Sequence, residues 1–395
     1  MVNFCKTIEE MRSRSPVTKE WAYLEIASTG LIPDFVYDGV RRYMDDRYYK
    51  GGDSIWAYPD ASVGTLGMWD RSKSAIGQMI NGDPSCIAFG TSSTQMFTMV
   101  TEGIEYGPED NVVALQDCWY GNRFAWQKRE TEGLEVRYAY PVSGEVRLEE
   151  IAKLVDDHTR AVTVNLVESG TGYRVDIDAI GAFCKERDIL LFVDGVQALG
   201  ALQVDVQRSN IDFMVGNDYK WMMNFCGCGY AYISPRVNRL ITRWGAGHMS
   251  DTERFNSAKS HLEQRADAGR FEIGYPNAAG IYGLGLTALQ YHLLGGANIE
   301  AYNLGLADYF RAQARATEGV RLTYDFAAEN LSQIVSIKVS PEVRITDADF
   351  EAAKVFIHFR GTDENGDREI RVAFHYFNNR EDIDRFFAVI RGGLI

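Results

Sequence analysis

Short apolar segments alternate with helix-like segments between about residues 75 and 235, and this alternation constrains the fold more than any other feature of the sequence. Six apolar runs in this part of the chain predict buried strands: 112–115, 136–140, 161–167, 189–193, 213–215 and 230–233. Between them, residues 148–155 and 178–187 have the character of helices. Strands that are apolar along their whole length and alternate with helices are typical of a mostly parallel sheet covered on both faces. We therefore predict a large α/β domain that binds its ligand at the carboxyl ends of the strands.

The last third of the chain has a different pattern, which predicts a second, smaller α+β domain. Helices are expected at 283–294, 349–358 and 380–390, and strands at 331–339 and 369–377. The predicted organisation is an N-terminal segment that packs on the small domain, a large domain and a small C-terminal domain, at residues 1–20, 21–284 and 285–395 respectively.

The charge and the cysteine content argue against several classes of protein. The net charge is −14, from 55 acidic and 41 basic residues, so a nucleic-acid backbone would be repelled. No apolar run approaches the roughly 18 residues needed to span a membrane, and the charged start of the chain does not resemble a signal peptide. The six cysteines are scattered, without the spacing of zinc ligands. We therefore expect a protein of the reducing cytoplasm, with no metal site and neither nucleic acid nor membrane as a partner.

A turn rich in small and hydroxylated residues, from Phe89 to Thr94, lies directly before a helix-like segment. The amide groups at a helix N-terminus, together with the hydroxyls of Ser93 and Thr94, suit the binding of a phosphate group. An ordinary serine or threonine helix cap is the simpler explanation of the same residues. Taken alone, this turn indicates a phosphate site only weakly.

Asp194 ends an apolar run, at the edge of the sheet where ligand-binding residues are expected. A buried carboxylate needs a cationic partner, and the protonated nitrogen of a pyridine ring is one such partner. A helix cap and a magnesium ligand are the alternatives. Gln197 follows three residues later, where its amide suits a hydrogen bond to the phenolic oxygen of the same ring.

Lys220 lies between the apolar strand at 213–215 and a turn rich in glycine and aromatic residues, Trp221–Gly229. A single lysine is usually a solvated surface charge. This setting predicts instead that the amine is removed from water, which lowers its pKa and makes it a nucleophile.

Taken in order along the chain, these features resemble fold-type I enzymes that depend on pyridoxal phosphate (PLP), specifically the class V aminotransferase and cysteine desulfurase family. The shared elements are the hydroxyl-rich turn, the Asp-Gly-Val-Gln-Ala sequence that begins at Asp194, the lysine, and the Gly-x-Gly at 227–229. The spacing of 26 residues from Asp194 to Lys220 also agrees. The resemblance runs from about Tyr23 to the C-terminus. It implies a large domain with a mostly parallel sheet of seven strands flanked by helices.

The resemblance assigns roles to the residues already singled out. Lys220 matches the lysine that forms the Schiff base with PLP, and Asp194 matches the carboxylate that pairs with the ring nitrogen. Gln197 matches the contact to the phenolic oxygen, and Ser93 and Thr94 match the phosphate site. Lys220 and Asp194 are therefore the expected catalytic residues.

The resemblance also implies further cofactor contacts. One of two neighbouring aromatic residues stacks on the cofactor, and we favour Trp119 over Tyr120. The chain departs from the family's usual residues at three positions that are also expected to touch PLP, namely Asn217, Tyr219 and Tyr275. Tyr275 lies in the segment 270–277, which in this family reaches the phosphate of a partner subunit, so we expect a homodimer.

Two positions are implied in substrate binding, and they predict a small amino acid as the substrate. Arg371 matches the arginine that binds the substrate carboxylate, a role that suits a planar guanidinium group. A surface ion pair is the alternative for this arginine. Ser169 lies in the segment Glu168–Gly172, which resembles the family's segment that approaches the substrate.

One departure from the family pattern bears on the reaction. Desulfurases of this family carry a sulfur-accepting cysteine just before the equivalent of Arg371, but residues 359–368 contain no cysteine and none follows Cys228. We therefore expect an aminotransferase, or a lyase or epimerase whose reaction begins at the Cα–H bond. The alternatives are a β-lyase like the cysteine desulfurases and selenocysteine lyases but without the loop cysteine, and a catalytically silent member of the family. The sequence leaves this choice open.

Overall fold

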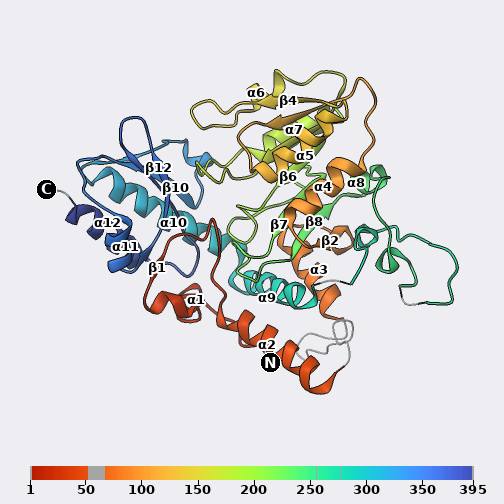
Figure 1. The fold of residues 1–395 in the computed structure, drawn as a ribbon, viewed down its shortest axis with the longest axis horizontal. Helices are drawn as coiled ribbons and strands as arrows, with labels where there is room; N and C mark the ends of the chain where they lie inside the picture. Colours follow the sequence, from red (N-terminus) through yellow and green to blue (C-terminus); the bar gives the residue numbers. More distant parts are fainter. Residues whose placement is uncertain (1, 52–66, 255, 276, 394–395) are drawn as a thin grey trace.

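The computed structural model describes residues 2–51, 67–254, 256–275 and 277–393, and it contains two main sheets, each with its own set of helices (Figure 1). The larger sheet lies on the right of Figure 1, and the smaller one lies on the left among the C-terminal elements coloured blue. The candidate site belongs to the larger sheet.

The large sheet is mostly parallel. Its strands are β2 (Ile87–Gly90), β3 (Asn111–Leu115), β4 (Glu135–Ala139), β5 (Thr159–Asn165), β6 (Leu190–Asp194), β7 (Phe213–Asn217) and β8 (Gly229–Ile233). Within the described residues, these seven strands have the order β2-β8-β7-β6-β5-β3-β4. Only β8 among them runs antiparallel to its neighbours, β2 and β7. The fold class expected from the sequence is therefore confirmed.

Helices cover both faces of this sheet, which explains why its central strands, such as β6 and β7, are buried along their whole length. These helices are α3 (Met68–Met79), α4 (Ser93–Gly103), α5 (Tyr120–Thr131), α6 (Leu148–Ala152), α7 (Ile177–Glu186), α8 (Pro235–Leu240) and α9 (Ala278–Leu294). Helix α2 (Asp34–Lys50) packs against α9. Because successive side chains of a strand point to opposite faces, Val193 and Met214 join one core with α3, α7 and α9. Phe192 and Phe213 join a second core with α4 and α5. In the described residues, no helix is long and apolar enough to cross a lipid bilayer.

The smaller sheet is antiparallel and has an apolar core of its own, in which Phe310, Phe350 and Phe386 are buried. Its strands and helices are β9 (Val320–Leu322), β10 (Ile334–Val339), β12 (His358–Thr362), β13 (Arg368–Ala373), α10 (Gly296–Arg315), α11 (Asp347–Ala352) and α12 (Arg380–Gly392). The predicted division near residue 285 falls inside α9, which packs against α2 and α3. The division itself stays a prediction.

The helix expected at 349–358 is wrong in its second half. Helix α11 ends at Ala352, and Lys354 adopts a left-handed backbone conformation with a φ of 56°. The chain then forms β11 (Val355–Phe356), which pairs in parallel with β1 (Ala22–Tyr23), and continues into β12. Because the partner strand lies at the other end of the chain, the local pattern of residues does not reveal the pairing.

A buried ion pair joins the N-terminal segment to the C-terminal helix. Helix α1 (Ile8–Ser13) carries Arg12, whose Nη1 and Nη2 atoms donate to the Asp382 carboxylate at 2.8 and 2.9 Å. Asp382 is fully buried in α12 and takes part in the capping box of that helix. Arg12 therefore neutralises a charge that would otherwise be buried alone.

We expect the substitution Arg12→Ala to lower the free energy of unfolding by about 3 kcal/mol, because it leaves the Asp382 carboxylate buried without its cation. Urea denaturation measures this change. Arg385→Ala is the matched control: Arg385 also connects α12 to the N-terminal segment, through the Glu20 carbonyl, but at an exposed position. The control is expected to change stability by less than about 0.5 kcal/mol. Equal losses in the two variants would contradict this interpretation.

Candidate functional site

The carboxyl ends of strands β2, β5, β6 and β7 meet at one edge of the large sheet. Asn165, at the end of β5, is paired in register with Asp194, at the end of β6. Asn217 ends β7 and is paired with Gly229 of β8, and Gly90 at the end of β2 is paired with the same glycine from the other side. The segments that follow these strands are therefore brought together.

A cavity of about 170 Å³ opens at this edge. It is lined by polar and aromatic side chains from the strand ends and from the segments that follow them. Those predicted from the sequence are Ser93, Thr94, Trp119, Ser169, Asp194, Gln197, Asn217, Tyr219 and Lys220. The other three predicted site residues, Tyr120, Tyr275 and Arg371, are not among the residues that line it.

Lys220 follows β7 and is partly buried, with its Nζ atom 5.6 Å from the centre of the Trp119 ring. Removal from water lowers the pKa of Lys220 from 10.5 to about 8, an effect that the negative charge of Asp194 partly opposes. The positive charge of Arg371 lowers this pKa further, while Glu25 raises it. With a pKa near 8, about a tenth of the amine is neutral at pH 7, compared with a few parts in ten thousand for an exposed lysine.

Asp194 is buried at the cavity wall, where its carboxylate oxygens accept two hydrogen bonds from the protein. Oδ1 accepts from the backbone N–H of Val196 at 2.8 Å, and Oδ2 accepts from Nδ2 of Asn122 at 2.5 Å. Burial raises the pKa of Asp194, and these two hydrogen bonds together with the Lys220 charge oppose that rise. A cation on the cavity side would stabilise the carboxylate further.

A neutral histidine fixes the backbone next to the lysine. Nε2 of His375 lies 3.1 Å from the carbonyl oxygen of Trp221, and its Nδ1 lies 3.2 Å from Nδ2 of Asn303. Burial lowers the pKa of His375 to about 3, so the ring carries a single proton. Because Asn303 offers an N–H to Nδ1, that proton is on Nε2 and is donated to the Trp221 carbonyl.

The hydroxyl-rich turn lies at the N-terminus of α4, as the sequence predicts. Ser92 is the helix cap and accepts from the N–H of Gln95 at 3.1 Å. The hydroxyls of Ser93 and Thr94 have no hydrogen-bond partner within the described part of the chain, and both residues line the cavity. A Cβ atom at Gly229 would lie 2.2 Å from the Ser92 carbonyl carbon, so only glycine lets the turn approach β8 this closely.

Gln197 is held in one orientation by two hydrogen bonds. Its Nε2 donates to the Ala27 carbonyl at 3.0 Å, and its Oε1 accepts from Nε1 of Trp221 at 2.8 Å. One N–H of the side-chain amide is left for the cavity, because an NH₂ group has two donors.

The two candidate stacking residues are separated by the structure. Trp119 lines the cavity, whereas Tyr120 does not. The Tyr120 ring lies against the outer side of the tryptophan, with the two ring centres 4.1 Å apart. This geometry favours Trp119 as the aromatic residue that would contact a bound ring.

Arg371 in β13 is almost completely buried next to the cavity, so it is not a surface ion pair. Its Nη2 donates to Oε1 of Glu25 and to Oγ of Ser28, both at 2.7 Å. Its Nη1 donates to the carbonyl oxygen of Ser169 at 2.9 Å. Burial lowers the pKa of Arg371, and the Glu25 carboxylate opposes this effect. The structure thus adds Glu25 and Ser28 to the residues that the sequence pointed to.

Tyr275 lies in a separate cavity of about 200 Å³, with its wall formed in part by Trp69, Phe89 and Trp244. Thr91 lines both this cavity and the one that contains Lys220, so the two are neighbours. Tyr275 thus lines this neighbouring cavity and is not among the residues that line the cavity of Lys220.

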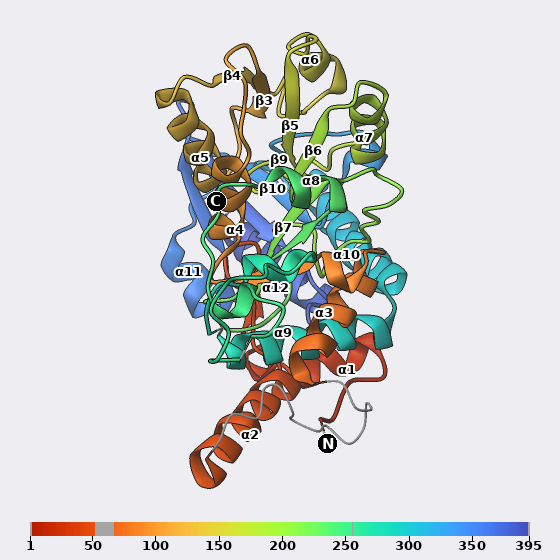
Figure 2. The same cartoon turned by 90° about the vertical axis from the view of Figure 1, so that its right-hand side faces the viewer.

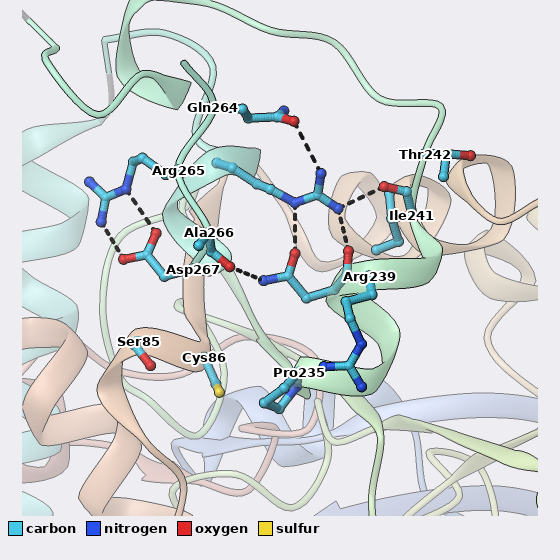
Figure 3. Close-up of a pocket in the computed structure, with 12 residues that line it drawn as sticks. Ser85, Cys86, Pro235, Arg239, Ile241, Thr242, Gln264, Arg265, Ala266 and Asp267 are labelled. Carbon is cyan, nitrogen blue, oxygen red and sulfur yellow. Dashed lines mark hydrogen bonds and ion pairs between the residues drawn. The ribbon is translucent and has the colours of Figure 1, made fainter.

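A larger cavity, about 790 Å³ in volume, is lined by residues from 85–86, 235–242 and 264–270 and has a different character (Figure 3). Arg270, one of its lining residues, donates from Nε to Oδ1 of Asn238 at 2.6 Å and from Nη2 to the Ile241 carbonyl at 2.7 Å. Arg265, on the wall, is paired with Asp267 at 2.5 Å. Because these guanidinium groups are already engaged by the protein, Arg270 fixes the local loops, and this cavity is not the candidate site.

Besides Glu25 and Ser28, the structure reveals two polar residues that the sequence analysis did not select, Asn122 and Asn165. Asn122 in α5 donates to Asp194, as described above. Asn165 lines the cavity, and its Nδ2 donates to Oε1 of Glu168 at 2.6 Å. Burial raises the pKa of Glu168 to about 8, so this carboxyl group is protonated at neutral pH. Asn165 had a visible signal, because it ends an apolar strand in the same way as Asp194.

Comparison with known proteins identifies the family. The model of the class-V aminotransferases matches residues 22–386. The chain belongs to that family. A probable cysteine desulfurase of Methanothermobacter thermautotrophicus is 24% identical to it over 398 residues, with 95% of each chain covered. The cysteine desulfurase CsdA of Escherichia coli, in its S-sulfonic acid form, has a TM-score of 0.83 at 17% identity over 98% of both chains.

A third similar protein is a cystine C–S lyase, solved in complex with its product cysteine persulfide. It has a TM-score of 0.82 at 19% identity, over 95% of this chain and 99% of that one. These structural similarities confirm the fold. The class-V family consists of PLP-dependent transferases and lyases, so the predicted family, cofactor and enzyme class are confirmed at this level.

The pKa of Lys220 generates a test that does not require a known substrate. We expect the rate at which Lys220 reacts with an added aldehyde to rise with pH through a midpoint near 8, because only the neutral amine is a nucleophile. Asp194→Asn should move the midpoint to lower pH, since it removes a charge that favours the cation. Arg371→Gln should move it to higher pH. Borohydride trapping followed by peptide mass spectrometry measures the modification of this one lysine. A midpoint above about 10 would show that the amine is exposed to water.

Proposed function

We propose that this protein is a PLP-dependent enzyme that removes the Cα proton of a small amino acid, with Lys220 as the residue that binds the cofactor and as the general base. The proposal is carried by the position of Lys220, an amine with a pKa of about 8 in a cavity that also contains Asp194 and the hydroxyl-rich turn. A general base is most effective when its pKa lies near the working pH. An aminotransferase, or a lyase or epimerase that begins at Cα–H, needs this step.

The donors and acceptors around the cavity fit PLP. The free hydroxyls of Ser93 and Thr94, at the N-terminus of α4, suit its phosphate. One amide atom of Asn217, assigned as Oδ1, is buried without a hydrogen-bond partner in the described residues, so the cavity contains an unsatisfied polar group. When bound, PLP supplies a cationic ring that accepts the electron pair left at Cα. Asp194 would keep the proton on the nitrogen of that ring.

Arg371 is the proposed ligand of the substrate α-carboxylate. Glu25 and the Ser169 carbonyl fix its guanidinium plane, as described above. Its Nε is buried and has no hydrogen-bond partner in the described part of the chain, so one polar group remains to be satisfied. A carboxylate held there would fix which bond at Cα faces the lysine, and proton removal at that bond would be favoured.

A lyase that acts on a sulfur-containing amino acid is the second candidate, because the relatives reported above are desulfurases and a C–S lyase. All six cysteines lie in the described residues, and each has a raised pKa, mainly because of burial. Burial raises the pKa of Cys118 to about 12, and it raises the pKa of Cys228 well above the usual thiol value. A thiolate is the sulfur acceptor in persulfide chemistry, so the second candidate is a lyase that releases its sulfur product directly.

We further propose a homodimer in the cytoplasm. Helix α2 projects from the body of the chain (Figure 2) and carries exposed Tyr37, Met44, Tyr48 and Tyr49. Apolar side chains gathered on one projecting helix suit an interface with a second copy. Six free thiols suit a reducing compartment.

The chemistry of Lys220 is tested by spectroscopy on the purified holoenzyme. The wild type is expected to show a visible absorbance band that changes when a substrate amino acid is added. Lys220→Ala should lose the band of the lysine-bound cofactor, and turnover should fall by about 10²- to 10⁴-fold. Lys73→Ala is not a suitable control, because Lys73 is buried in an ion pair with Glu272. Lys128→Ala, at an exposed position, should leave both measurements unchanged.

The products distinguish the candidate reactions in a screen of single amino acids. An aminotransferase releases one keto acid per site and stops until a second keto acid is added, whereas an epimerase produces the opposite enantiomer. A lyase releases ammonia, or a sulfur product, continuously. A colourless protein that takes up no PLP would overturn the proposal.

A further inference from the structure

We propose that Arg360 binds a negatively charged group at the end of the substrate's side chain, so that the substrate is an acidic amino acid. This inference rests on the function proposed above and specifies the class of substrate. The argument depends on where Arg360 lies, on the absence of a protein partner for its charge within the described residues, and on its relation to Arg371.

Arg360 lies at a β-bulge in the edge strand of the smaller sheet. Strand β12 pairs with β13, with His358 opposite Arg371, and the register shifts between Phe359 and Gly361. Arg360 is therefore the extra residue of the bulge. A bulge bends its strand and redirects a side chain, and bulges are common next to active sites. Here the redirected side chain is a guanidinium group.

The Arg360 side chain lines a cavity of about 310 Å³ that shares Ser169 with the cavity of Lys220. It lies against the backbone of Gly170, because a Cβ atom placed on that glycine would be 3.3 Å from Nη2 of Arg360. Arg371 contacts the preceding residue, since its Nη1 donates to the Ser169 carbonyl at 2.9 Å. Two guanidinium groups therefore lie against the dipeptide Ser169–Gly170, and Ser169 lines both cavities.

The protein leaves the charge of Arg360 without a partner. In the part of the chain that the structure describes, Arg360 makes no hydrogen bond or ion pair, whereas Arg371 is paired with Glu25 at 2.7 Å. The positive charge of Arg360 also lowers the pKa of Arg371, which shows that the two cations are within electrostatic reach of each other. An anion between them would relieve this repulsion.

In the described residues, none of the carboxyl groups on the cavity wall pairs with Arg360. Glu369 is paired with Lys338 at 3.2 Å, and Glu168, with a pKa of about 8, is protonated at neutral pH. Arg123 adds a second cation, whose Nη1 donates to the Gln116 carbonyl and whose guanidinium lies over the Phe124 ring. Asp117 is the remaining anion on the wall. Within the described residues, the two arginines of the cavity wall, Arg123 and Arg360, are therefore not paired with any carboxylate.

A carboxylate suits this position because a guanidinium group binds it with two parallel hydrogen bonds. The substrate α-carboxylate would lie at Arg371, and a second carboxylate at the end of the side chain would lie at Arg360. Aspartate and glutamate have this chemistry. Asparagine and glutamine have nearly the same shape without the charge, so they are matched probes.

The first experiment compares these four amino acids with the PLP-loaded enzyme. Wild type is expected to have a higher kcat/KM for the acidic amino acids than for their amides. Arg360→Gln should lower kcat/KM for the acidic pair by about 10- to 100-fold, mainly through KM, and should change it for the amides by less than about threefold. Arg360→Lys should restore part of the loss, since it keeps the charge but not the paired hydrogen bonds. Arg321→Gln, which removes an exposed arginine from β9 at the opposite edge of the same sheet, should have no effect.

The second experiment measures binding and does not depend on turnover. Succinate and glutarate are compared with butyrate by isothermal titration. We expect the dicarboxylates to bind wild type about 10- to 100-fold more tightly than butyrate, and Arg360→Gln to remove this preference while leaving the binding of butyrate unchanged.

The two experiments separate the inference from the function on which it rests. An enzyme that turns over no amino acid but still prefers dicarboxylates through Arg360 would overturn the proposed function alone. Equal losses for butyrate and for the dicarboxylates in Arg360→Gln would show that Arg360 binds the α-carboxylate, which overturns this inference. Equal kcat/KM values for aspartate and asparagine, and for glutamate and glutamine, would overturn it as well.

Discussion

A lysine amine that is kept away from water near a buried carboxylate is the constraint on which the rest of this structure depends. Burying either charge alone is unfavourable. Here the cost is reduced in two ways: the lysine is deprotonated more easily, and Asp194 accepts hydrogen bonds from Val196 and Asn122. Such an arrangement needs a rigid frame, which the two cores on the faces of the large sheet provide. The proposed chemistry follows from this one arrangement.

Much of the fold could be predicted because burial on both faces leaves a plain signal in the sequence. The central strands β6 and β7 are short, buried, mainly apolar runs, and residues such as Phe192 and Val193 face opposite cores. The same reasoning failed where pairing over long range decides the structure. Residues 355 and 356 form a strand because Ala22 and Tyr23 pair with them. The residues near 355 in the sequence carry no sign of a partner at the other end of the chain.

In the site, too, the residues that could be predicted are those identified by their neighbours in the sequence, and the residues that were missed depend on contacts between distant parts of the chain. Asp194, Asn217 and the hydroxyl-rich turn could be found because polar residues that end apolar strands gather at one edge of a parallel sheet. Asn122 could not be found in this way, since its role depends on how α5 packs beside β6. Glu25 was likewise hidden, because its contact with Arg371 joins opposite ends of the chain. The assignments of roles within the family remain predictions for each of these residues.

The hydrogen bond from His375 to the Trp221 carbonyl has a consequence for how the protein responds to its surroundings. With a pKa of about 3, this histidine keeps a single tautomer throughout the range in which Lys220 and Glu168 exchange protons, near pH 8. The hydrogen bond between His375, which follows β13, and the Trp221 carbonyl, next to Lys220, is therefore kept when Lys220 and Glu168 titrate. Acidity alters the reactivity of the centre, while the architecture that surrounds it stays in place.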